Sequence, residues 1–272
     1  SWADGRGTSA DIDGIDDVGF LEKLMDSLIA NYAVDTARIY MAGFSNGGFM
    51  TQRMACQSNQ HLAAVASLGS TLDTNLINIC NPGRSLPALI VMGTADPFVP
   101  YNGGAMQGNV TPIVSTTTAF EFWKNNNACA SAIDSSNVAN IDTTDNSTVT
   151  VFTYSNCQCN ADVKLYRINN GGHTWPGVEI AQLEPTLGET NEDINGSQII
   201  WDFFEQHTLC NTIDVSSPKQ QVNSISVFPN PASNYITFES EPNLNKIAIV
   251  NLQGQTLISL SPKSSPTRIA ID

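Results

Sequence analysis

Apolar and polar positions follow two rhythms along residues 1–211. Apolar runs at 62–68, interrupted only by Ser67, and at 86–92 predict buried strands, because a strand covered on both faces has no polar side. Between such runs, apolar residues recur at spacings of three and four, which predicts amphipathic helices. In the first of these helices, capped by Asp16 or Asp17, the inward positions are Val18, Leu21, Met25, Leu28 and Tyr32.

The alternation continues to the end of this region. Further strands are predicted at 38–42, 149–154 and 163–168, and further helices at 115–126 and 195–206. In the last helix, the residues expected to face inward are Ile199, Ile200, Phe203 and Phe204. Because strands alternate with helices, we predict an α/β fold with a mostly parallel sheet for residues 1–211.

The pattern changes at about Thr212. Residues 212–224 have no apolar periodicity and are predicted to form a linker. From 225 to 272, short alternating segments are separated by turn residues, which predicts a small all-β module. Within it, the segments 246–250 and 256–260 form a predicted hairpin.

One glycine-rich pentapeptide indicates a nucleophilic serine. Directly after the predicted strand at 38–42 comes Gly43-Phe44-Ser45-Asn46-Gly47. A G-x-S-x-G turn from a strand into a helix exposes the serine hydroxyl, and we expect a Cβ at Gly43 or Gly47 to collide with neighbouring backbone. Ser45 is therefore the candidate nucleophile, although such a turn can also be a plain connection.

A nucleophilic serine needs a base and a group that orients the base. Among the three histidines, His61 is expected to point away from the turn, and His207, near a helix C-terminus, to be a dipole partner or solvent-exposed. His173 follows the predicted strand at 163–168 in a glycine-rich loop and is the candidate base. The alternative is a loop histidine packed on Trp175.

Asp96 is the candidate acid, because it directly follows the buried run at 86–92 in a loop stiffened by two prolines. The alternative is an Asx-turn, which an Asp-Pro sequence favours. The chain order Ser45, Asp96, His173 is that of α/β-hydrolases and differs from the order in chymotrypsin-like and subtilisin-like enzymes.

Several segments resemble the polyhydroxybutyrate depolymerase and feruloyl esterase group of secreted α/β-hydrolases. They are Trp2-Ala3-Asp4-Gly5-Arg6-Gly7, Asp16-Asp17-Val18-Gly19-Phe20, Gly43-Phe44-Ser45-Asn46-Gly47-Gly48, Gly93-Thr94-Ala95-Asp96 and Gly172-His173-Thr174-Trp175-Pro176-Gly177. The resemblance covers residues 1 to about 210 and implies Ser45 as nucleophile, Asp96 as orienting acid and His173 as base. Trp175 is the candidate substrate-binding residue, with the holding of its own loop as the alternative.

The chain departs from a complete α/β-hydrolase upstream of Ser45. Only 44 residues precede it, and they contain no loop of the type that supplies the second oxyanion donor. We therefore expect an N-terminally truncated chain that keeps one donor, the backbone N–H of Asn46. Because loss of one donor costs on the order of 10² to 10³ in rate, poor activity of this chain is expected.

Residues 225–272 resemble the C-terminal sorting domain of the type IX secretion system, through Phe228-Pro229-Asn230-Pro231-Ala232-Ser233 and Asn251-Leu252-Gln253-Gly254-Gln255. The resemblance implies a β-sandwich-like export signal, incomplete at its last strands, that secretion machinery recognises. A carbohydrate-binding module is the alternative, but Tyr235 and Phe238 supply little of the aromatic platform that it needs.

Composition excludes several classes of function. With 26 acidic and 12 basic residues, the net charge of −14 argues against nucleic-acid binding. No apolar stretch approaches the roughly 18 residues that span a bilayer. The acidic stretch at 11–17 lacks the glycine and glutamate of a calcium-binding EF-hand loop and is interpreted as a solvated turn before a capped helix. We predict no metal and no cofactor.

The six cysteines lack zinc-type spacing and predict disulfides, which form in an oxidising compartment. By resemblance and position, Cys56 is expected to pair with Cys80. Cys129 is then expected to pair with Cys157 or Cys159, which leaves Cys210 for the other.

Together these patterns predict a secreted or cell-surface serine esterase. The resemblance implies feruloyl or acetyl esters of plant polysaccharide, or a polyhydroxyalkanoate polyester, as substrates. Two alternatives stay open: a serine peptidase of the same fold, and a non-catalytic polysaccharide-binding protein on a hydrolase scaffold.

Overall fold

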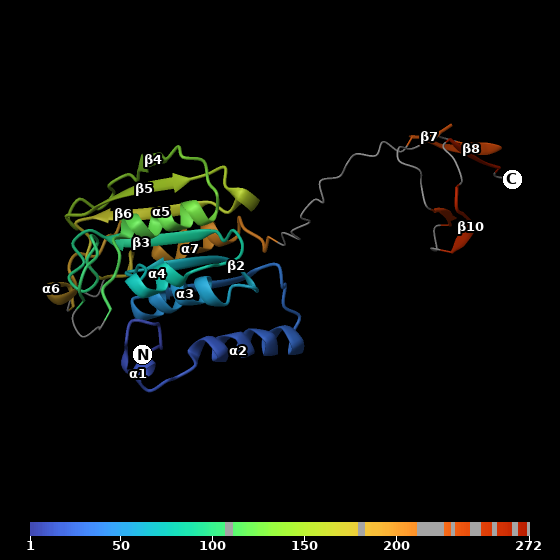
Figure 1. The fold of residues 1–272 in the computed structure, drawn as a ribbon. Helices are drawn as coiled ribbons and strands as arrows, with labels where there is room; N and C mark the ends of the chain where they lie inside the picture. The colour runs from blue at the N-terminus through green and yellow to red at the C-terminus, as the bar shows by residue number, and fades with distance from the viewer. Residues whose placement is uncertain are drawn as a thin grey trace. The chain divides into compact units, whose positions relative to one another are not determined.

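The structure, a computed structural model, describes residues 1–106, 111–178, 183–210, 226–229, 232–239, 246–251, 255–262 and 266–270. The chain divides into two compact units, Ser1–Thr212 and Ile213–Asp272 (Figure 1). The predicted linker at 212–224 lies outside the described residues.

The first unit is built on a six-stranded sheet with the order β1-β2-β3-β6-β5-β4 (Figure 1). Its strands are β1 (Ile39–Phe44), β2 (Leu62–Leu68), β3 (Ala88–Gly93), β4 (Asp134–Asn137), β5 (Thr148–Tyr154) and β6 (Val163–Asn169). Strands β1, β2, β3 and β6 are parallel, whereas β5 runs antiparallel to both β6 and β4. The predicted α/β class with a mostly parallel sheet is confirmed. Strand β4 was not among the predicted strands, because all of its residues are polar and exposed.

The helices of this unit are α1 (Ser9–Ile12), α2 (Asp17–Asn31), α3 (Asn46–Gln57), α4 (Thr74–Ile79), α5 (Thr116–Asn126), α6 (Glu184–Leu187) and α7 (Gly196–Phe204), with a 3₁₀ turn at Gln158–Asn160. Polar side chains set the starts of five of them. Thr8, Asp16, Asp73, Ser115 and Asn195 each accept a hydrogen bond from a backbone N–H in the first turn of α1, α2, α4, α5 and α7, respectively.

The side chains of β2 and β3 alternate between two apolar clusters. Val65 and Ile90 pack with buried residues of α3 and α5. Ala64 and Leu89 belong to a second cluster that includes Phe203 of α7. Since helices cover both faces of the sheet, every residue of β2 and β3 is buried, which is why their sequences are apolar except for Ser67, which accepts a hydrogen bond from Gln52.

Helix α2 buries less than its pattern predicts. Val18, Leu21 and Met25 pack against the core, whereas Leu28 and Tyr32 are 43% and 69% exposed. The prediction that these last two residues face inward is therefore wrong. Helical spacing identifies the side of a helix that can be buried, but not how far neighbouring elements extend along it.

Three disulfides link parts of the first unit: Cys56–Cys80, Cys129–Cys157 and Cys159–Cys210. The first joins the end of α3 to the residue that follows α4. The other two select one of the two pairings that the sequence leaves open. Within the described ranges, no helix is both long enough and apolar enough to cross a bilayer.

The second unit contains only β-strands in its described residues. Strands β7 (Ser226–Phe228), β8 (Tyr235–Glu239) and β11 (Thr267–Ala270) form an antiparallel sheet in the order β11-β8-β7. Strands β9 (Ile247–Val250) and β10 (Thr256–Leu260) form an antiparallel pair, as the predicted hairpin requires. The turn residues 252–254 between them lie outside the described residues.

Candidate active site

The turn between β1 and α3 holds Ser45 in an unusual backbone conformation, with φ 53° and ψ −121°. A non-glycine residue in this region costs on the order of 1–3 kcal/mol and is held there by its surroundings. Gly43 permits this tight turn, since a Cβ on it would lie 2.1 Å from the carbonyl oxygen of Gly47. The expectation for Gly47 is wrong, because a Cβ there would meet nothing within 4 Å. Gly48 is the second crowded position, where a Cβ would lie 2.1 Å from Oγ of Ser70.

Ser45, His173 and Asp96 meet at the carboxyl ends of three parallel strands. Ser45 follows β1, Asp96 follows β3 and His173 follows β6. The Oγ atom of Ser45 lies 2.9 Å from Nε2 of His173, and Nδ1 of His173 lies 2.7 Å from Oδ2 of Asp96. The structure therefore brings all three predicted residues together, although they are 128 and 77 positions apart in sequence.

The partners of His173 determine its tautomer. An ionised carboxylate only accepts hydrogen bonds, so Nδ1 of His173 carries the hydrogen and donates to Asp96. The lone pair of Nε2 is then free to accept the hydroxyl hydrogen of Ser45. His173 is 7% exposed and packs against the rings of Phe44 and Phe98, at centroid distances of 4.7 and 5.4 Å.

Asp96 also forms the turn that its sequence suggests. Its Oδ1 accepts hydrogen bonds of 2.8 Å from the backbone N–H groups of Phe98 and Val99, while Oδ2 faces His173. The two interpretations of this aspartate are compatible, because each concerns a different carboxylate oxygen. The two backbone donors fix the direction in which Oδ2 points.

The other two histidines lie elsewhere. Nε2 of His61 is 3.0 Å from the carboxylate of Asp26 on α2, and His61 precedes β2 at the edge of the sheet opposite Ser45, as predicted. The prediction of an exposed His207 is wrong: this residue is 7% exposed and its ring packs on Phe203 at 4.6 Å. Burial, together with the positive charge of Lys164, lowers the pKa of His207 to about 4.

Asn46 is the first residue of α3, so its backbone N–H belongs to the first helical turn, where donors have no acceptor within the helix. Its side chain is tied to the N-terminal segment. Oδ1 accepts from the N–H of Trp2 at 2.6 Å, and Nδ2 donates to the Trp2 carbonyl oxygen and to Asp4. Sequence analysis missed these contacts, because they join residues that are more than 40 positions apart.

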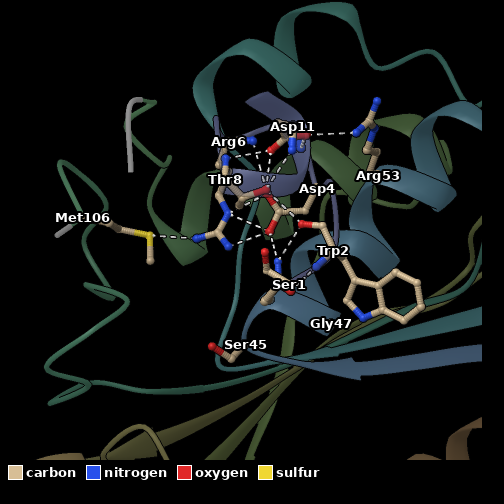
Figure 2. Close-up of polar contacts among 12 residues, drawn as sticks. Ser1, Trp2, Asp4, Arg6, Thr8, Asp11, Ser45, Gly47, Arg53 and Met106 are labelled. Carbon is tan, nitrogen blue, oxygen red and sulfur yellow. Dashed lines mark hydrogen bonds and ion pairs between the residues drawn. The ribbon is translucent and has the colours of Figure 1, made fainter. Parts of the chain in front are cut away.

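Asp4 is in turn held by Arg6 (Figure 2). Nε and Nη2 of Arg6 donate to the Asp4 carboxylate, and the Arg6 guanidinium stacks over the ring of Phe49 at 3.6 Å. The side chains of Arg6 and Asp4 are 5% and 0% exposed. Asp73 lies near this pair, and burial is the main cause of its raised pKa.

In the acidic stretch at 11–17, residues 12–16 are exposed and Asp16 caps α2, as the predicted solvated turn before a capped helix requires. Asp11 is partly buried and accepts hydrogen bonds from the N–H groups of Gly5, Gly7 and Thr8. Burial raises the pKa of Asp11, but these hydrogen bonds outweigh burial, so the pKa is below its ordinary value. The described residues contain no cluster of three or more potential metal ligands.

Two cavities adjoin His173. The larger, of about 480 Å³, is lined by Ser45, His173 and Arg6, and the other described residues that line it are apolar. The smaller, of about 200 Å³, is lined by residues that include Phe44, Trp175 and Thr190. Trp175 is half-buried and faces the edge of Phe44 at 6.2 Å, so it both lines a cavity and packs within the site. The two interpretations of Trp175 are compatible.

Residues 2–124 match the phospholipase/carboxylesterase family model, and residues 226–272 match the model of the secretion system C-terminal sorting domain. Feruloyl esterase B of Piromyces equi is 32% identical over 71% of this chain and 32% of its own length. Similar proteins include the putative esterase NocK of Nocardia uniformis subsp. tsuyamanensis (26% identity, 69% of this chain, 57% of the relative). A third is the bifunctional acetylxylan esterase/xylanase XynS20E of Neocallimastix patriciarum (24% identity, 78% of this chain, 27% of the relative).

The chain thus spans between about a quarter and three fifths of the length of these relatives. The sorting-domain match and the three disulfides identify a secreted or cell-surface protein. The first unit contains the mostly parallel sheet and the serine turn that the sequence predicts, and its residues 2–124 give the esterase match. The first unit therefore has an α/β-hydrolase fold whose residues 2–124 match the phospholipase/carboxylesterase family, and residues 226–272 match a secretion system C-terminal sorting domain.

Proposed function

We propose that the protein hydrolyses carboxylic esters, with Ser45 as nucleophile, His173 as base and Asp96 as the residue that orients His173. The observation that carries this proposal is the continuous series of hydrogen bonds from Ser45 Oγ through both ring nitrogens of His173 to Asp96. The family match and the names of the esterase relatives support it.

In the proposed reaction, Ser45 Oγ attacks the ester carbonyl carbon while its proton passes to Nε2 of His173. Negative charge develops on the carbonyl oxygen, where the backbone N–H of Asn46 donates a hydrogen bond. The protonated His173, stabilised by Asp96, then gives its proton to the leaving alcohol, and the acyl group stays on Ser45. A water molecule deprotonated by His173 hydrolyses the acyl-enzyme and regenerates the site.

The proposed substrates are feruloyl or acetyl esters of plant polysaccharide. Two of the relatives are named for these activities, a feruloyl esterase and an acetylxylan esterase/xylanase. Trp175 is proposed to contact the substrate through the smaller cavity. The sorting domain is the proposed contact with the secretion machinery.

Labelling with a fluorophosphonate, followed by peptide mapping, tests the proposed nucleophile. We expect the adduct on Ser45, because His173 activates this hydroxyl, and we expect no adduct in Ser45→Ala and almost none in His173→Ala. Unlabelled protein from the same preparation is assayed on feruloyl, acetyl and polyhydroxyalkanoate esters and on a matched amide. Absence of an adduct on the folded chain contradicts the proposal and favours a polysaccharide-binding role.

A further inference from the structure

Arg6 uses one edge of its guanidinium group to hold Asp4. Nε lies 3.1 Å from each carboxylate oxygen, and Nη2 lies 2.6 Å from Oδ2. Nη1, on the other edge, contacts only a weak acceptor, the sulfur of Met106 at 3.5 Å (Figure 2). Within the part of the chain that the structure describes, Nη1 has no stronger acceptor.

This arrangement is costly for a buried cation. The Arg6 side chain is 5% exposed, so water reaches its N–H groups poorly. A buried donor without a good acceptor loses its hydration and gains little in return. Such donors are usually explained by a partner that is absent, and at the edge of a cavity that partner can be a bound molecule.

The weakly bonded edge of Arg6 belongs to the larger cavity. Arg6 and Met106 both line it, together with Ser45 and His173. Its volume of about 480 Å³ falls within the range of about 300–1,000 Å³ that is typical of small-molecule sites. Because the remaining wall is apolar, Arg6 is the cationic side chain among the described residues that line this space.

The charges around Arg6 indicate what its free edge can bind. The carboxylate of Asp4 already neutralises the guanidinium, and a second carboxylate, Asp73, interacts electrostatically with both groups. A third carboxylate in the cavity would therefore be repelled about as much as it is attracted. An uncharged oxygen accepts a hydrogen bond from Nη1 without this repulsion.

We propose that Arg6 is a specificity-determining residue, whose Nη1 donates a hydrogen bond to an uncharged oxygen on an otherwise apolar acyl group bound beside Ser45. A ring hydroxyl or methoxyl group is an oxygen of this kind. The inference rests on the proposed ester hydrolysis. It adds the residue that recognises the acyl group and the kind of acyl group that this residue favours.

The test compares methyl cinnamate with its ring-hydroxylated and ring-methoxylated derivatives. For the unaltered chain, we expect kcat/KM to be about ten- to a hundredfold higher for the best oxygenated ester than for methyl cinnamate, which is the effect of a hydrogen bond from a charged donor. In Arg6→Lys this ratio is expected to approach one, because the ammonium group can hold Asp4 but has no second edge. The ratio is independent of the fraction of active protein.

Arg53→Met is the matched control. Arg53 also binds the N-terminal segment, at the carbonyl oxygen of Ala3 and at Asp11, but it does not line the cavity. The ratio should not change in this variant. If Arg6→Lys folds poorly, the double variant Asp4→Asn/Arg6→Met removes donor and buried charge together, and it is expected to lose the preference as well.

Two results overturn the inference: no preference for oxygenated esters in the unaltered chain, or an unchanged ratio in the Arg6 variants. An unchanged ratio with an equal loss of kcat/KM on all esters would mean that Arg6 acts on a part common to every ester. Failure of the proposed function is separate, since the unaltered chain would then hydrolyse none of these esters. In that case, calorimetric binding of the same esters to Ser45→Ala, with and without Arg6→Lys, tests the recognition of the oxygen directly.

Discussion

Asp96 illustrates how much a single side chain can determine at this site. One carboxylate oxygen binds two backbone N–H groups of its own loop, and the other binds His173. The loop therefore aims the carboxylate before any substrate is present. A substitution can therefore change the atom that faces His173 and keep the oxygen that binds the two backbone N–H groups.

We predict that Asp96→Asn lowers kcat by on the order of 10⁴ with little change in stability. The Asn side-chain oxygen can still accept from Phe98 and Val99, but its amide group donates toward Nδ1 of His173. The hydrogen then moves to Nε2, which can no longer accept the proton of Ser45. Ester hydrolysis and thermal unfolding measured on the same sample check this; a decrease below tenfold contradicts it.

At the level of secondary structure elements, apolar patterns predicted those whose environment is uniform. Strands β2 and β3 are buried along their length, and their boundaries lie within two residues of the predicted apolar runs. Elements at the edges were harder to predict. Strand β4 is fully exposed and has no apolar residue to mark it, whereas the last turn of α2 keeps its apolar spacing although its residues are exposed.

The C-terminal end of α7 contributes a pH-dependent part of the stability. His207 has a pKa of about 4 in the folded protein and about 6.5 when unfolded, so folding favours its neutral form. This contribution is fully present above pH 6.5 and is lost as the pH falls towards 4. We predict a decrease of about 2 kcal/mol in the free energy of unfolding between pH 7 and 4.5 from this group.

Urea unfolding of the chain and of His207→Phe at both pH values measures this contribution. The Phe ring keeps the contact with Phe203 but cannot be protonated, so its decrease in stability should be smaller by the same amount. Other groups titrate equally in both proteins. Equal pH dependence of the two would show that His207 can ionise without cost in the folded state.

At the level of the complete chain, two units perform separate tasks. The first carries the proposed catalytic residues, and the second matches a sorting domain. Cys210, near the end of the first unit, forms a disulfide with Cys159. This bond attaches the last described residue before the linker region to the body of the first unit. Export and catalysis should therefore be separable by mutation.

We predict that removal of residues 226–272 abolishes export but leaves the site around Ser45 intact. In a bacterium with a type IX secretion system, with the same leader peptide on both chains, the full chain should reach the medium or the cell surface and the shortened chain should stay inside. Immunoblotting of the fractions, with fluorophosphonate labelling of each, is the measurement. Equal export of the two chains contradicts the prediction.

The proposed catalytic residues could be found in the sequence because each follows a segment with a strand-like pattern. A parallel sheet brings the carboxyl ends of its strands to one edge, so Ser45, Asp96 and His173 converge wherever the loops are short enough. The order of these residues and the glycines of the turn add chemical identity to that placement. Local pattern and residue type were sufficient for this part.

Contacts between distant segments depended on the folded structure. The Asp4–Arg6 pair reaches Asn46 through space, His207 is buried by residues that pack around it, and two disulfides select between pairings that spacing left open. None of these leaves a periodic signal, because each depends on how separate elements pack. The sequence thus specified the order of the elements and the proposed nucleophile, acid and base, whereas folding determined which side chains surround them.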